Sequence, residues 1–174
     1  MAFVQSADER YAEAFVEWIN SFDHLPYTCE HISQLSDGVL LRDILLDIDP
    51  KWFRSMHSVD MGDNWVFKVN NLKKMYKLIS RYYEEVFSQG LQTLPAVNLT
   101  AIAKETDTKE ILKLCQRILY LAIQSTKTEK YINKIQRLSQ PSQHALMVSI
   151  EQVRSLTCSL VNMKPLLWVC LTGG

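Results

Sequence analysis

A chain of 174 residues, 47% of them apolar, is long enough for one domain with a modest extension and too apolar to be disordered. Its 19 basic and 19 acidic residues balance, so no overall field would attract nucleic acid or an anionic membrane, and only local patches could do so. The five glycines and five prolines lie mostly between periodic segments. This composition favours a single all-α domain over a β-sandwich.

The first half of the chain contains three segments with apolar residues at helical spacing. We expect a helix over Glu9–Phe22 with Asp8 as its N-cap, and a second over Ser33–Ile48. Gly38 weakens the second helix, and it could instead allow a neighbouring helix to approach closely. The longest expected helix, about Asp63–Phe87, has a predicted core stripe made of Val66, Val69, Leu72, Tyr76, Ile79, Tyr83 and Val86.

A connector beginning at Leu94-Pro95 precedes the next expected helix, Lys109–Ile123. Either Thr106 or Thr108 could cap the start of that helix. Cys115 lies within its apolar stripe and is predicted to be a buried free thiol.

Two shorter helices are expected over Glu129–Leu138 and from Pro141 to about Val153. Pro141 suits the first turn of a helix, where its missing N–H group costs nothing. The domain is therefore predicted to span residues 8–153, and an atypical apolar tail to follow over residues 154–174. Its apolar run Leu166–Leu171 is too short to cross a bilayer, and the tail could either pack on the domain or be an alternative terminus.

The sequence contains no recognisable catalytic signature, such as a nucleophile elbow, a phosphate-binding glycine loop or a zinc-protease motif. His24, Cys29 and His31 are three potential metal ligands in one loop, but a closed zinc site needs a fourth. We therefore predict no enzymatic activity, no cofactor and no metal. The N-terminal ten residues lack the apolar stretch of a secretory signal, which indicates a reducing cytoplasm.

Two surfaces could bind partners. The first is a basic face on the longest helix, where Lys74, Lys77 and Arg81 are three and four residues apart and Lys73 lies beside them. Tubulin or nucleic acid would complement such a face, although a solvated helix surface has the same pattern.

The second surface lies on the last helix. Gln143, Met147 and Ile150 are spaced i, i+4, i+7 and share one face, and Leu146 and Val153 widen the apolar arc. One part of this arc could pack on the domain while another forms the wall of a groove. In the other interpretation, all of it is core or is covered by the C-terminal tail.

Several segments, in order, resemble the N-terminal domain of the Hook family of motor adaptors. They are LSDGV (35–39), IDP (48–50), GDNW (62–65), NLKK (71–74), LPAVNL (94–99) and the terminal-helix segment from SQH (142–144) through Met147 and Ile150. The resemblance covers about Tyr11 to Val153.

The resemblance implies a calponin-homology-like helical bundle with a C-terminal helical extension. It also implies that a helix of the cytoplasmic dynein light intermediate chain binds in a groove at Gln143, Met147 and Ile150. Direct binding to microtubules through Lys73, Lys74, Lys77 and Arg81 is the alternative function. The expected location is cytoplasmic and cytoskeleton-associated, on microtubules and at the centrosome. The family's coiled coil does not follow residue 154 here, so a monomer is expected.

Overall fold

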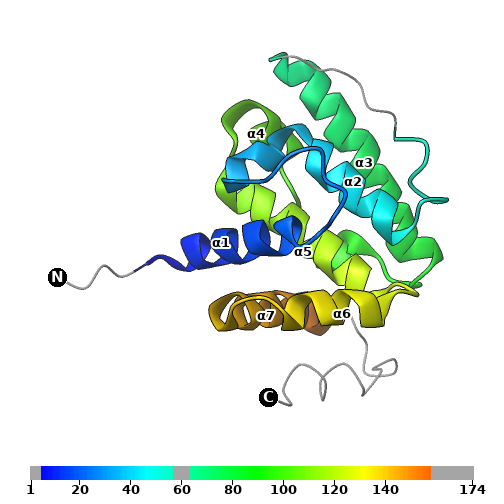
Figure 1. Cartoon of the computed structure of the whole chain (residues 1–174). Helices are drawn as coiled ribbons and strands as arrows, with labels where there is room; N and C mark the ends of the chain where they lie inside the picture. Colours follow the sequence, from blue (N-terminus) through cyan, green and yellow to red (C-terminus); the bar gives the residue numbers. More distant parts are fainter. Residues whose placement is uncertain (1–4, 57–62, 158–174) are drawn as a thin grey trace.

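The computed structural model describes residues 5–56 and 63–157, and every regular element within these ranges is helical (Figure 1). The expected all-α fold is therefore confirmed. Within these ranges no helix has the length and apolar character needed to span a bilayer. In chain order the elements are α1 (Ala7–Asn20), the 3₁₀ helix η1 (Ile32–Asp37), α2 (Val39–Ile48), α3 (Trp65–Glu85), the 3₁₀ helix η2 (Leu91–Thr93), α4 (Leu99–Glu105), α5 (Thr108–Gln124), α6 (Thr128–Gln136) and α7 (Gln140–Thr157).

Helix α5 is the centre of the bundle and contacts α1, α2, α4, α6, α7 and η1. Residues 117–123 are all buried, as expected for a helix segment that has neighbours on every side. The hydroxyl of Tyr83 in α3 donates to the carbonyl oxygen of Arg117 at 2.6 Å, and its ring stacks on Tyr120. Cys115 is a buried free thiol, which confirms the expectation from the sequence.

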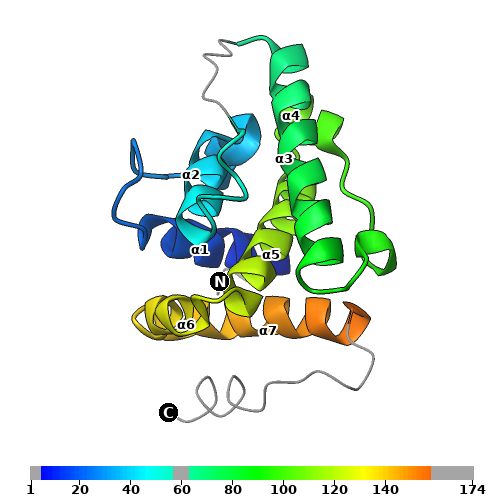
Figure 2. The ribbon, with the colours of Figure 1, turned by 90° about the vertical axis from the view of Figure 1, so that its right-hand side faces the viewer.

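The remaining helices surround α5 on different sides. Helix α7 runs across the base of the bundle and packs against α1 and α5 (Figure 2). Helices α3 and α4 pack against each other, and α3 begins at the end of the bundle farthest from α6 and α7. The start of α3 and the whole of α7 are therefore separate surfaces.

Gly38 divides the segment that was expected to form one helix over Ser33–Ile48. The glycine adopts the left-handed conformation at φ 78°, where it ends η1 and begins α2. A Cβ atom at this position would lie 3.2 Å from the side chains of both Leu72 and Met75. The predicted continuous helix is wrong, and the predicted close approach of a neighbouring helix is confirmed.

Two expected helix caps and one expected connector need correction. Ser6, not Asp8, is the N-cap of α1, because the Ser6 hydroxyl accepts from the Glu9 N–H while the Glu9 carboxylate accepts from the Ser6 N–H. Asp107, rather than either neighbouring threonine, caps α5 by accepting from the Glu110 N–H. The connector also contains a helix that was not predicted, α4, which its N-cap Asn98 begins.

The predicted core stripe of α3 is wrong at both ends. Val66 is 46% exposed and Val86 is 50% exposed, whereas Val69, Leu72 and Ile79 between them are buried. Val66 lies in the first turn of α3, and Val86 is its C-cap, directly after the last helical residue Glu85.

The predicted domain limits, residues 8–153, lie close to the limits of the bundle. Helix α7 continues to Thr157 and therefore includes the first residues of the expected apolar tail. The rest of that tail, 158–174, lies outside the described residues.

Candidate partner-binding surfaces

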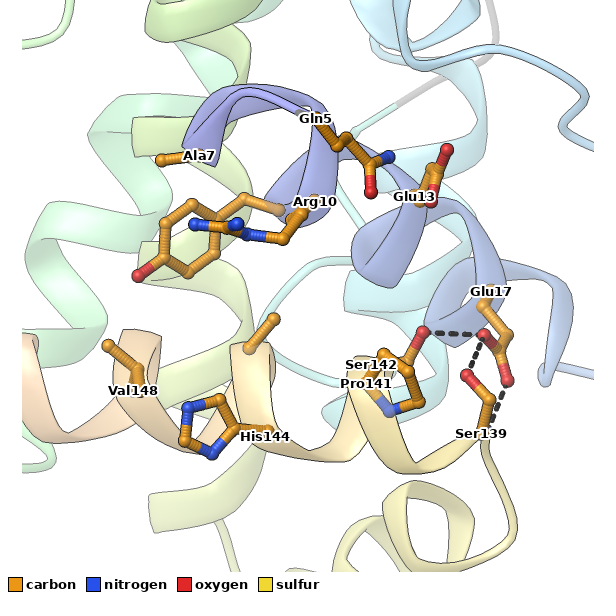
Figure 3. A pocket seen from close by; sticks show the side chains of 12 residues that line it. Gln5, Ala7, Arg10, Glu13, Glu17, Ser139, Pro141, Ser142, His144 and Val148 are labelled. Carbon is orange, nitrogen blue, oxygen red and sulfur yellow. Dashed lines mark hydrogen bonds between the residues drawn. The ribbon is translucent and has the colours of Figure 1, made fainter. Parts of the chain in front are cut away.

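Helix α7 is anchored to α1 by a carboxylate. Glu17 of α1 accepts hydrogen bonds from the Ser139 N–H at 2.6 Å, the Ser139 hydroxyl at 2.9 Å and the Ser142 hydroxyl at 2.5 Å (Figure 3). Partial burial raises the pKa of Glu17, but the hydrogen bonds from Ser142 and Ser139 outweigh it and leave the pKa below its ordinary value. A negative charge at this end of α7 also complements the helix dipole. We call these three residues the Glu17 anchor.

A cleft of about 520 Å³ lies between α1 and α7 beside this anchor. Arg10 and Tyr11 line it from α1, and Pro141, His144 and Val148 line it from α7 (Figure 3). None of the three residues predicted to form the groove lines this cleft. The cleft and the predicted groove face therefore lie on different margins of α7.

The predicted groove face lies on the margin of α7 that meets the end of α6. The side-chain amide of Gln143 donates to the carbonyl oxygens of Gln136 at 3.2 Å and Leu138 at 2.7 Å. Gln136 is the last residue of α6, where carbonyls have no partner within the helix, and Leu138 lies two residues past its end. Gln143 therefore already joins α6 to α7.

The other two residues of the groove face differ in exposure. Met147 is half-buried, and Ile150 is only 7% exposed. The shared face predicted by the i, i+4, i+7 spacing is present, but it is not open along its whole length. Ile150 belongs to the same core cluster as Leu146 and Val153.

The predicted basic face lies on the solvent side of α3. Lys73, Lys74 and Lys77 are exposed. Arg81 is engaged within the chain, because its guanidinium pairs with Glu85 at 3.0 Å and lies 5.8 Å from the centre of the Trp52 ring. The three lysines are thus the cations that this face offers to a partner.

The potential metal ligands in the loop after α1 do not form a cluster. Cys29 is buried, and its thiol donates to the backbone oxygen of His31 at 3.4 Å. Across residues 5–56 and 63–157, no three His, Cys, Asp or Glu side chains come together in a way that could hold a metal ion.

The sequence interpretation missed one exposed apolar feature, made of Trp65, Val66 and Phe67 at the start of α3. These side chains are 42%, 46% and 56% exposed. Three consecutive bulky apolar residues cannot all face one neighbour in a helix, since successive residues point about 100° apart. Three consecutive apolar residues in an expected helix were therefore the sequence signal that at least one of them would be exposed.

A bundle of this kind around a buried central helix, with α7 added across its base, is a calponin-homology-like fold with a terminal helix. The family model described as the HOOK domain matches residues 10–152, and the chain therefore belongs to the Hook domain family. The resemblance read from the sequence motifs is confirmed.

Individual relatives agree with this assignment. The chain is 31% identical over 147 residues to Protein Hook homolog 1 of Danio rerio and 32% identical over 149 residues to Protein Hook homolog 3 of Homo sapiens. Each match covers 82% of this chain and 20% of the relative, so the chain spans about one fifth of their length. The solution structure of the conserved domain of mouse HOOK1 superposes with a TM-score of 0.78 at 29% identity, covering 92% of this chain and 100% of that one.

Proposed function

We propose that this Hook domain is a non-enzymatic motor-adaptor module that binds a helix of the cytoplasmic dynein light intermediate chain beside α7. Such a module would serve microtubule-based transport in the cytoplasm. Two observations together carry the proposal. The chain belongs to the Hook domain family over residues 10–152, and Gln143, Met147 and Ile150 form a row along one margin of α7, which we call the groove row.

The burial of this row supports helix-in-groove recognition, in which an amphipathic ligand helix lays its apolar side chains into a hydrophobic furrow. Met147 is half-buried and its flexible side chain can adapt to a ligand. Ile150 is nearly covered and would form the floor of the groove, while Gln143 lies where α6 ends.

The attachment of α7 also suits this role. The Glu17 anchor fixes the first turn of α7 to α1, and Gln116 of α5 donates to the Ser149 oxygen at 3.1 Å farther along the helix. Both attachments lie away from the groove row. A ligand helix could therefore bind beside Met147 without displacing these two attachments.

The experiment is a titration of a labelled light-intermediate-chain helix peptide against the wild type, Met147→Ala and Val148→Ala. Val148 is the matched control, since it is also half-buried in α7 but lines the α1–α7 cleft. We expect Met147→Ala to weaken binding by about ten-fold, the equivalent of 1.4 kcal/mol, and Val148→Ala to leave it unchanged. Equal binding by both variants, or no binding by the wild type, would contradict the proposal.

Direct microtubule binding is the second candidate, and the exposure of Lys73, Lys74 and Lys77 favours it. Ionic strength separates the two functions. Contacts between exposed lysines and an acidic protein surface weaken steeply as salt is added, whereas burial of apolar side chains in a groove does not.

A further inference from the structure

The three apolar side chains at the start of α3, Trp65, Val66 and Phe67, form a surface that we call the α3 tip. All three are more than 40% exposed. The ammonium of Lys104 in α4 lies 5.2 Å from the centre of the Trp65 ring. Asn64 caps the helix by accepting from the Val66 N–H, so the tip stands on a formed helix end. An exposed apolar cluster of this kind marks a contact surface.

The α3 tip continues directly into the basic face of the same helix. Val66 and Lys73 are seven residues apart, as are Phe67 and Lys74, which is two helical turns and places each pair on one side. Lys77 follows on the same side. Val66, Phe67 and the three lysines therefore lie on one side of α3, over about 16 Å from Val66 to Lys77 at 1.5 Å per residue, and Trp65 lies beside them at the start of the helix.

The charge of this surface is positive and local. Residues 65–77 contain four lysines and no acidic residue, and the positive end of the helix dipole adds to them. The acidic residues of α3 lie at its other end, at Glu84 and Glu85. Asp60 and Asp63 precede the tip in sequence, and Glu105 follows Lys104 at the end of α4. Because the whole chain has zero net charge, any attraction for an anionic partner must come from such a patch.

We propose that this surface binds an anionic lipid bilayer, with the α3 tip inserted at the interface and Lys73, Lys74 and Lys77 on the headgroups. Tryptophan and phenylalanine beside lysines are the residues with which amphipathic helices bind to membrane surfaces. A cluster of lysines next to them attracts acidic headgroups. An acidic protein would match the lysines but would need a separate apolar pocket for three adjacent side chains, whereas a bilayer supplies both.

The position of the α3 surface allows it to bind a membrane while α7 binds a ligand helix. The α3 tip lies at the opposite end of the bundle from α7 (Figures 1 and 2). A ligand helix beside α7 and a membrane at the tip can therefore be bound at the same time. The membrane proposal stands on the α3 surface alone and does not require the light-intermediate-chain function.

The experiment is co-sedimentation of the full chain at low salt with vesicles of phosphatidylcholine alone and of phosphatidylcholine mixed with phosphatidylserine. We expect the wild type to bind the anionic vesicles and to be released by salt. The double variant Val66→Asp/Phe67→Asp should bind at least ten-fold more weakly. Lys73→Ala/Lys74→Ala/Lys77→Ala should lose roughly a hundred-fold, since each lysine near an anionic surface contributes about 1 kcal/mol and 1.4 kcal/mol is a factor of ten.

Val86→Asp is the matched control. It is the same residue type at the C-cap of the same helix with similar exposure, 50% against 46% for Val66, but it follows Glu84 and Glu85. We expect it to bind vesicles as the wild type does. Because all the substituted side chains are exposed, thermal melts should show that every variant is folded.

Several outcomes would overturn the proposal. They are no binding of the wild type to anionic vesicles, equal binding to uncharged vesicles, or a tip variant that binds as tightly as Val86→Asp. The same variants are also sedimented with microtubules. If the tip variant loses microtubules while vesicle binding is unchanged, the tip contacts protein and the membrane assignment is wrong. Quenching of Trp65 fluorescence by brominated lipid, lost in Trp65→Phe, should accompany binding.

Discussion

Helices α3 and α7 offer two candidate binding surfaces of opposite kinds. The α3 surface is open, because its lysines and the apolar side chains of the α3 tip are exposed and lie outside the core. The α7 surface is partly built into the fold, because Gln143 joins α6 to α7 and Ile150 is almost completely covered. Changes on α3 should therefore separate binding from stability, whereas changes on α7 should alter both.

Ile150→Ala should have the largest effect, and it tests how far the α7 surface is part of the core. Removing a buried isoleucine side chain lowers the free energy of unfolding by roughly 2–5 kcal/mol, through lost burial and the cavity left behind. We also expect binding of a light-intermediate-chain peptide to weaken by ten-fold or more. Denaturant titration and peptide titration measure the two effects.

Ile150→Val is the companion variant, with an expected loss of about 0.5–1.5 kcal/mol. If Ile150→Ala melted like the wild type, the side chain would be free of the core, and the contrast between α3 and α7 would fail.

Glu17→Gln tests the anchor that holds the other margin of α7. Losing a charged acceptor at a helix N-terminus should lower the free energy of unfolding by about 0.5–2 kcal/mol. Because the folded-state pKa of Glu17 lies below its unfolded value, the stabilisation is present above about pH 4.3 and is lost as pH falls through the folded pKa.

The wild type should thus be more stable than Glu17→Gln at neutral pH and equally stable in strong acid. Glu13→Gln is the control, an exposed glutamate one turn earlier in α1. A difference between wild type and Glu17→Gln that stays constant across the acid range would contradict the assigned role.

Gln143→Ala should produce a smaller loss of about 1 kcal/mol, because two carbonyl oxygens at the end of α6 lose their donor but one of them remains near solvent. Peptide binding should also weaken if the amide reaches the ligand. Gln140→Ala, at an exposed position in the first turn of the same helix, controls for helix propensity. Unchanged melting of Gln143→Ala would remove this residue from the α6–α7 junction.

Charge reversal at Lys73, Lys74 and Lys77 should have the smallest effect on stability, within about 0.5 kcal/mol per site, because all three side chains are exposed. Arg81 is left unchanged, because substituting it would also remove its pair with Glu85 and its contact with Trp52 and could alter stability as well as binding. Microtubule co-sedimentation at low salt should be abolished if these lysines bind tubulin. Unchanged sedimentation would contradict that alternative.

The sequence determined the helical architecture, because apolar periodicity specifies both the element and the side of it that must be covered. Six expected helical segments correspond to η1–α2 and to α1, α3, α5, α6 and α7, and the burial of Cys115 followed from the same pattern. The ordered motifs also identified the family before any fold was known. Local propensity was weaker at helix ends, where Ser6 and Asp107 displaced the expected caps.

The tertiary structure decided which apolar residues of a predicted face are covered. Val66 and Ile150 both lie on apolar arcs, yet Val66 is 46% exposed and Ile150 is 7% exposed. Apolar periodicity predicts which face of a helix a side chain lies on. It does not predict whether another element packs against that face. The Glu17 anchor, between residues 122 positions apart, could not be read from any local pattern for the same reason: long-range contacts arise only when the chain has folded.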